Sequence, residues 1–214
     1  MAPTCRRADM PELSLLLCLR QASSKELLSR LGRIESTLDG RIDFEMILIG
    51  YGPPDDSGLA FRRATDEFPR CRTVMHTRPC PSAEALGYGV RIAGAPWVGL
   101  LPTIHEPTQN EADQVADMLA LARRAGGALT CVHAGPESPV LFSAAAFAGL
   151  PRVRAMLTWL PELFEWTGQP CWRHPGNQES GSAGFTRRLL RRLWVASCCL
   201  WATRGGLKAA GTNA

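Results

Sequence analysis

The first 135 residues of the chain alternate between two hydrophobic periods. Short, nearly continuous apolar runs predict strands that are covered on both faces of a parallel sheet. Five runs have this character, at residues 13–19, 44–50, 72–76, 96–101 and 128–133. Segments with helical periodicity lie between them. Strands that alternate with helices of this length predict a doubly wound, mostly parallel α/β sheet.

Two of the intervening helices carry an expected start signal. Ser23 and Glu26 are spaced as a capping box, and apolar residues follow at helical spacing. Thr108 and Glu111 repeat this box before a second amphipathic segment. A shorter helix is predicted over about residues 82–93. In such a fold ligands bind beyond the carboxyl ends of the strands, so the loops that follow the first, second and fourth strands are expected to form the site.

The pattern changes after residue 135. Residues 137–150 and 152–166 have helical character and are predicted to be helices. The chain as a whole is predicted to consist of an α/β domain at 11–170, a polar loop at 171–185, a basic amphipathic helix at 186–204 and a disordered tail at 205–214. Cys131 and His133 stand two positions apart on one predicted strand, so they point to the same face, where core packing is favoured over a catalytic pair.

Composition describes an ordinary globular protein. Of the 214 residues, 45% are hydrophobic and 21% are charged, which is enough apolar material for one sizeable core. The eight cysteines are scattered and form no CxxC pair, which favours a reducing cytoplasm. No signal peptide is recognisable. The net charge of +4 is concentrated near the end of the chain, which argues against a nucleic-acid-binding domain.

The predicted terminal helix combines arginine and tryptophan, a composition typical of helices that lie on a membrane surface. The candidate membrane-facing residues are Arg187, Arg188, Arg191, Arg192, Trp194 and Trp201. Anionic headgroups would attract its arginines. Docking of the apolar face on the domain's own core explains the same pattern equally well. The predicted location is the cytoplasm, with peripheral binding to the inner face of the membrane as an alternative. An anionic membrane surface and another protein are both candidate partners.

Several stretches, in this order, resemble family-2 glycosyltransferases, and within them the polyprenyl-phosphate (dolichol-phosphate) sugar transferases. They are PELSLLLCLRQASSKELLSRL, DFEMILIGYGPPDD, ALGYGVRIAGAPWVGLL and WLPELFEWTGQP, followed by the basic terminal helix. The resemblance implies a nucleotide-sugar transferase fold of the GT-A type. It also implies a nucleotide-sugar donor, a lipid-linked phosphate acceptor, and Mg²⁺ or Mn²⁺ held by carboxylates beside the diphosphate.

The sequence departs from this family where the chemistry is expected. The family's Asp pair after the second strand falls on Gly50 and Tyr51, and its D-x-D motif after the fourth strand falls on Pro102 and Ile104. Pro102 and Ile104 have no side-chain oxygen, so the metal that the family implies lacks its ligands, and Gly50 cannot accept a hydrogen bond from a nucleobase. We therefore expect no certain cofactor. Losing such a metal costs several kcal/mol of transition-state stabilisation, or roughly 10³-fold in rate.

Neighbouring polar residues are candidates to replace these groups. The candidate nucleotide contacts are Gln21, Gly52, Asp55 and Asp56. Asp55 and Asp56 fit equally well as turn and N-cap residues. His105 and Glu106 are weak candidates for a substitute metal site, although Glu106 also suits the start of a helix.

Two functions follow from the resemblance and its gaps. The first is a sugar transferase that moves a sugar from a nucleotide sugar to a polyprenyl phosphate, with weak or no activity. The second is a non-catalytic relative that keeps the fold and acts as a membrane-associated or partner-binding module. The region between residues 135 and 150 is several dozen residues shorter than in the family, which favours the second function. The basic loop that the family places before its last helix is also missing.

Overall fold

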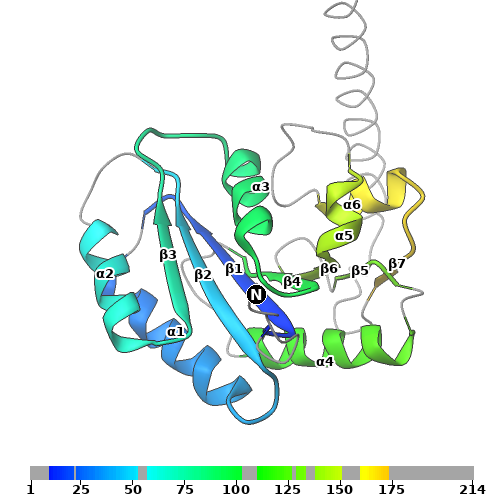
Figure 1. Ribbon diagram of the computed structural model, residues 1–214, viewed down its shortest axis with the longest axis horizontal. Coiled ribbons are helices and arrows are strands. Elements are labelled where there is room, and N and C mark those ends of the chain that lie inside the picture. The colour runs from blue at the N-terminus through cyan, green and yellow to red at the C-terminus, as the bar shows by residue number, and fades with distance from the viewer. Residues whose placement is uncertain are drawn as a thin grey trace, which may run out of the picture.

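The structure is a computed structural model, which describes residues 10–21, 23–52, 57–102, 110–126, 129–133, 138–150 and 160–173. Strands and helices alternate along most of the chain (Figure 1). In chain order the elements are β1 (Leu13–Leu19), α1 (Ser24–Leu38), β2 (Phe44–Gly50), α2 (Ser57–Glu67), β3 (Cys71–Met75), α3 (Ser82–Ile92), β4 (Trp97–Leu100), α4 (Glu111–Arg124), β5 (Cys131–His133), β6 (Val140–Ser143), α5 (Ala144–Ala148), α6 (Leu160–Trp166) and β7 (Cys171–Arg173).

In the described part of the chain the strands form one seven-stranded sheet in the order β3-β2-β1-β4-β6-β5-β7. β1 pairs in parallel with β2 and β4, β2 with β3, and β5 with β7. β6 runs antiparallel to both of its neighbours, β4 and β5. The predicted doubly wound, mostly parallel sheet is therefore confirmed, with one reversed strand in its second half.

Two hydrophobic cores cover the two faces of the sheet. Alternate residues of β1 and β2 pack against α1, α2 and α4 on one face. The intervening residues pack against α3, α5 and α6 on the other face (Figure 1). Every residue of β1 is buried, and β2 is buried except for one half-buried position. This double coverage is why both strands have continuous apolar runs instead of alternating ones.

The predicted start of α1 is correct in position, whereas α4 has a different N-cap residue from the one predicted, and neither helix has the predicted capping box. Ser23 is the N-cap residue of α1, yet its side chain makes no capping hydrogen bond. α4 begins at Glu111 with Asn110 as its N-cap residue, and Asn110 makes no side-chain capping bond either. Thr108 lies outside the described residues. Glu111 does not close a capping box, because its carboxylate pairs with Arg30 of α1 instead.

The structure corrects two expectations in the second half of the chain and adds one helix in the first half. Residues 137–150 do not form a helix throughout, because Val140–Ser143 is β6 and only Ala144–Ala148 is helical. Residues 171–173 form β7 where a polar loop was expected. The helix α2 was not predicted at all. Of the predicted helix at 152–166, residues 160–166 are α6 and the preceding ones lie outside the described residues.

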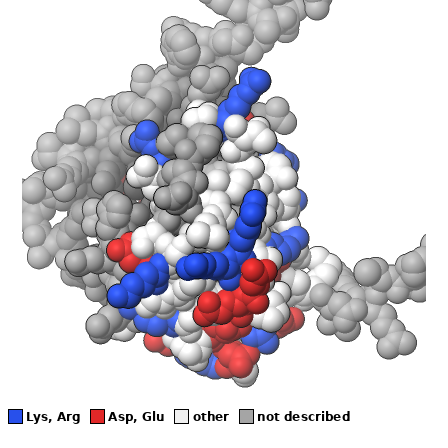
Figure 2. All heavy atoms as spheres, turned by 90° about the vertical axis from the view of Figure 1, so that its left-hand side faces the viewer, with Lys and Arg blue, Asp and Glu red and all other residues white. Residues whose placement is uncertain are grey.

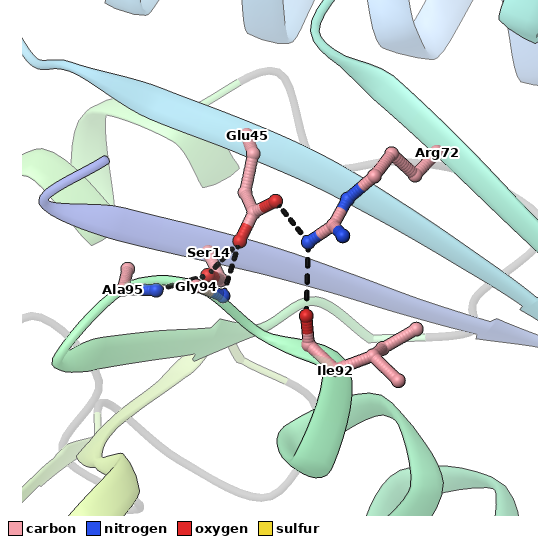
Figure 3. A network of polar contacts seen from close by, with 6 residues as sticks. All are labelled: Ser14, Glu45, Arg72, Ile92, Gly94 and Ala95. Atoms are coloured by element: carbon pink, nitrogen blue, oxygen red, sulfur yellow. Dashed lines mark hydrogen bonds and ion pairs between the residues drawn. The ribbon is translucent and has the colours of Figure 1, made fainter. Parts of the chain in front are cut away.

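A polar network joins the amino ends of the first four strands, at the edge of the sheet opposite their carboxyl ends (Figure 3). The Glu45 carboxylate accepts hydrogen bonds from Ser14 Oγ and from the Gly94 backbone N–H, both at 2.6 Å, and pairs with Arg72. Arg72 also donates to the Ile92 carbonyl at 2.9 Å. The network therefore anchors the connection from α3 to β4 on β1, β2 and β3.

Candidate functional site

The carboxyl ends of β1, β2, β3 and β4 meet at one edge of the sheet, and the segments that leave them continue the strand pairing. The Tyr51 N–H donates to the Leu19 carbonyl at 3.0 Å, and the His76 N–H donates to the Gly50 carbonyl at 2.9 Å. The Leu101 N–H donates to the Leu16 carbonyl at 3.0 Å. These bonds hold the first residues after each strand side by side at the edge where α/β sheets bind their ligands.

The space beside Gly50 is occupied by other side chains. Gly50 is the last residue of β2 and is buried. A Cβ atom added there would lie 2.3 Å from Met75 Sδ and 2.8 Å from the Phe61 ring. The sequence predicts only that Gly50 lacks a carboxylate. The structure adds that Met75 of β3 and Phe61 of α2 fill the space that a carboxylate would need.

Gly52 is required by a close approach of two backbone segments. A Cβ atom at this position would lie 1.8 Å from the Arg20 carbonyl oxygen. Only glycine allows the segment after β2 to pass so near the segment after β1. Its match to the glycosyltransferase pattern therefore has a structural reason, independent of any contact with a nucleotide.

Tyr51 takes the place of the second expected carboxylate, and it presents a neutral phenol. The side chain is half-buried, and burial and the neighbouring Cys18 raise its pKa, while Arg20 opposes the shift. Burial also raises the pKa of Cys18 to about 12 and, together with Glu84, raises the pKa of Cys80. At neutral pH Tyr51, Cys18 and Cys80 carry their protons, so this group supplies hydrogen-bond donors and no negative charge.

The segment after β4 is anchored by a buried ion pair. Arg30 of α1 donates from Nε to Glu111 Oε1 at 2.7 Å and from Nη2 to Glu111 Oε2 at 2.6 Å. The same Nη2 donates to the Pro102 carbonyl at 2.8 Å. Both charged side chains are buried, at 7% and 5% exposure. Glu111 is thus a carboxylate near the expected D-x-D position, but its charge is neutralised by Arg30.

Aromatic and basic side chains lie beside the end of β3. The rings of His76 and Tyr88 meet edge to face, with centroids 5.5 Å apart. The Arg91 guanidinium lies over the Tyr88 ring, 5.4 Å from its centroid. Tyr88 and Arg91 are three residues apart on α3, so one helix face presents both. No sequence signal distinguishes these residues, because an aromatic and a basic residue at helical spacing are common on any exposed helix.

The structure places only some of the predicted site residues. Gln21 is exposed directly after β1, and Gly50, Gly52 and Pro102 lie at the same edge of the sheet. The other predicted residues lie outside the described part of the chain; they are Asp55, Asp56, Ile104, His105, Glu106, Arg187, Arg188, Arg191, Arg192, Trp194 and Trp201. Arg30 was missed, although its position among the buried residues of α1 was a signal that it needs a buried partner.

The residues that the structure describes include neither a metal-binding cluster nor a membrane-spanning helix. These residues contain no cluster of three or more His, Cys, Asp or Glu side chains that could hold a metal ion. Their helices include none with the length and apolar character needed to cross a membrane. The side of the molecule where α2 lies in Figure 1 carries basic and acidic side chains next to each other, as Figure 2 shows, so it does not have a single sign of charge. Arg70 and Asp39 form an ion pair at 2.6 Å.

Structure comparison identifies the fold. The chain is similar to a mannosyltransferase from Pyrobaculum calidifontis in complex with GDP-Man and Mn²⁺, with a TM-score of 0.61 and 15% identity over 86% of this chain and 62% of that one. It is also similar to glucosyl-3-phosphoglycerate synthase from Mycobacterium tuberculosis in complex with Mn²⁺ and UDP-Glc, with a TM-score of 0.57 and 15% identity over 88% and 79% of the two chains. By sequence, no family model and no curated protein matches. The protein therefore has the GT-A fold of glycosyltransferases, and it spans 62% of the length of the mannosyltransferase chain.

Proposed function

We propose that this protein is a GT-A domain that binds a nucleotide diphosphate or nucleotide sugar at the carboxyl edge of β1–β4 without a divalent metal. Sugar transfer by it is weak or absent. The observation that carries the proposal is the buried ion pair of Glu111 with Arg30, because the nearest described carboxylate after β4 is already neutralised. The filled space beside Gly50 adds to it, because Met75 and Phe61 occupy the room that a base-binding carboxylate would need.

Positive charge from arginine can offset part of the diphosphate charge in place of a metal. Arg20 is exposed directly after β1 and is close enough to Tyr51 to influence its pKa. Its backbone is fixed against Gly52, so the base of the side chain is held at the site. We therefore assign the diphosphate contact to Arg20, with Tyr51 as a neutral donor beside it.

Calorimetric titration tests the proposal. UDP, UDP-glucose and GDP-mannose are titrated into the full chain with Mn²⁺ and with EDTA. We expect at least one of these ligands to bind, with the same affinity in both buffers. Arg20→Gln should weaken that binding about tenfold, which corresponds to ~1.4 kcal/mol. Arg33→Gln is the matched control, because Arg33 is an equally exposed arginine on α1. Binding that requires Mn²⁺ would contradict the proposal.

The acceptor class is the one that the sequence resemblance implies, a polyprenyl phosphate. Transfer from the nucleotide sugar that binds to a short-chain polyprenyl phosphate is measured with the purified chain. We expect a rate at least ~10³-fold below that of a metal-dependent transferase, because metal stabilisation of the leaving diphosphate is missing. Turnover at an ordinary rate, in Mn²⁺ or without it, would refute the proposal.

The alternative function is a non-catalytic module that contacts a membrane or a protein partner. Its support is the absence of side-chain oxygen at Gly50 and Pro102, together with the arginine- and tryptophan-rich segment at 186–204. Cosedimentation with vesicles of phosphatidylserine and phosphatidylcholine tests it. Vesicle binding that disappears at high salt, in a chain that binds none of the three nucleotide ligands, would favour this alternative.

A further inference from the structure

Two cysteines face each other across neighbouring strands in the second half of the sheet. β5 and β7 pair in parallel, and Cys131 stands opposite Cys171 in their register. The pairing is fixed just before these residues, because the Thr130 N–H and Oγ1 both donate to the Pro170 carbonyl, at 2.9 and 3.1 Å. Both cysteines belong to the core that packs under α3 and α6, so their side chains point to the same face.

The geometry of this pair is suitable for a covalent bond. Adjacent strands lie about 4.8 Å apart, and the Cα atoms of disulfides are usually about 4.4–6.8 Å apart. Both thiols are free, and the neighbouring Cys171 contributes to the raised pKa of Cys131. Cys131 is completely buried, whereas Cys171 is half-buried.

The other described cysteines do not share this arrangement. Cys18 on β1 stands opposite Ile49 in the register of β1 and β2. Cys71 on β3 stands opposite Met46 and belongs to the core on the other face of the sheet. Cys80 lies before α3, outside any strand. Among the described residues, Cys131 and Cys171 are therefore the pair that strand register brings face to face.

We propose that Cys131 and Cys171 form an oxidisable dithiol that a low-molecular-weight disulfide converts into a cross-strand disulfide between β5 and β7. This inference is independent of the proposed nucleotide site. Cys171 loses its proton to solvent, and its sulfur attacks one sulfur of oxidised glutathione, which breaks the S–S bond and forms a mixed disulfide; the released thiolate takes up a proton and leaves as one reduced glutathione. Cys131 then loses its proton to solvent, and its sulfur attacks the Cys171 sulfur and expels the second reduced glutathione. Two protein thiols are oxidised, and one glutathione disulfide is reduced to two thiols.

The order of the two steps follows from exposure. Cys171 is the sulfur that the reagent reaches first, and Cys131 is the resolving thiol held against it. The neighbouring Cys171 and burial raise the pKa of Cys131, which keeps this thiol protonated and unreactive until the mixed disulfide forms beside it. The new bond ties β7, the last strand at this edge of the sheet, to its only neighbour in the described sheet.

Oxidation of the full chain tests the proposal. The protein is incubated with oxidised glutathione, its remaining thiols are alkylated, and non-reduced peptides are analysed by mass spectrometry. We expect a linked peptide pair that contains Cys131 and Cys171, lighter by two hydrogens and separated by dithiothreitol. The oxidised chain should also unfold at a temperature several degrees higher, because the bond closes a loop of about forty residues in the unfolded state.

Single substitutions distinguish this pair from other cysteines. Cys171→Ser should abolish both the linked peptide and the rise in unfolding temperature, whereas Cys71→Ser should leave both unchanged. In Cys131→Ser the reaction should stop at a glutathione adduct on Cys171. Three results from the unsubstituted chain would each overturn the proposal: no oxidation, a stable glutathione adduct without the linked pair, or a link from either cysteine to another partner.

Discussion

Replacing Glu111 with glutamine removes the charge that compensates Arg30. The guanidinium would then be buried, with 7% of its side chain exposed, and would have only neutral acceptors in the amide oxygen of the substituted residue and the Pro102 carbonyl. Breaking a buried ion pair by removing one partner costs about 3–5 kcal/mol, because the remaining charge has lost its solvation and its partner. Glutamine still accepts a hydrogen bond, so we expect a loss near 3 kcal/mol, the lower end of this range.

A second ion pair between the same regions provides the control. Arg41, which follows α1, pairs with Asp113 in the first turn of α4 at 2.8 Å, and both side chains are about half exposed, at 51% and 52%. Exposed pairs contribute about 0–1 kcal/mol, since water screens both charges. Asp113→Asn makes the same chemical change, two residues away on the same helix. It should cost less than ~1 kcal/mol.

Urea unfolding followed by circular dichroism measures both variants, with free energies taken by linear extrapolation. We expect Glu111→Gln to be less stable than Asp113→Asn by ~2 kcal/mol or more, with this difference nearly unchanged by added salt. The double variant Arg30→Met with Glu111→Leu should recover most of the loss, because no unpaired charge remains. Equal costs for the two single variants, or a double variant less stable than Glu111→Gln, would refute the assignment of a buried, mutually dependent pair.

Three further predictions concern stability and reactivity. Gly50→Asp should destabilise the chain by at least ~1–3 kcal/mol in urea unfolding, because the new side chain overpacks the space that Met75 and Phe61 fill. Met75→Ala in the same chain should relieve part of that cost. A Gly50→Asp chain of unchanged stability would mean that the space is open. Glu45→Gln should cost ~1–2 kcal/mol by the same measurement, since the charge-assisted bonds of the network at the amino ends of the strands become neutral, and an unchanged midpoint would argue against that network. Burial raises the pKa of Cys18 and Cys71 to about 12, above the unfolded value near 9.0. The stability that comes from keeping these thiols protonated is therefore fully present below pH 9 and is lost as the pH rises toward 12. At pH 8 the native chain should protect both thiols from iodoacetamide, and rapid labelling without urea would contradict this.

Sequence patterns located the strands and helices whose own run of apolar residues specifies the structure. β1 and β2 have the predicted bounds, because seven-residue runs with a single strongly polar position each can only be covered by packing on both faces. β6 was misread because its four residues run directly into the alanine-rich α5, and so the whole segment has helical composition. Its strand conformation comes from antiparallel pairing with β4 and β5, a tertiary effect that no local window contains.

The candidate site was predictable in what it lacks but not in what fills it. The absence of a side-chain oxygen at Gly50 and Pro102 is visible in the sequence alone. The occupation of the space by Met75 and Phe61 is not visible, because these residues lie on other elements and carry no motif. The same is true of Arg30, whose partner Glu111 is 81 positions away.

These contacts show that the altered positions are not isolated losses. If Gly50 had only lost a carboxylate, the site would contain an empty volume that water or a restored Asp could occupy. Instead the neighbouring strand and helix have side chains packed into that volume. On the other side of the site, the nearest described carboxylate after β4 is held by an arginine that also donates to the Pro102 carbonyl. Packing beside Gly50 and this ion pair therefore stabilise the two sides of the edge, and the groups that the described residues present there include the Arg20 guanidinium and the Tyr51 phenol.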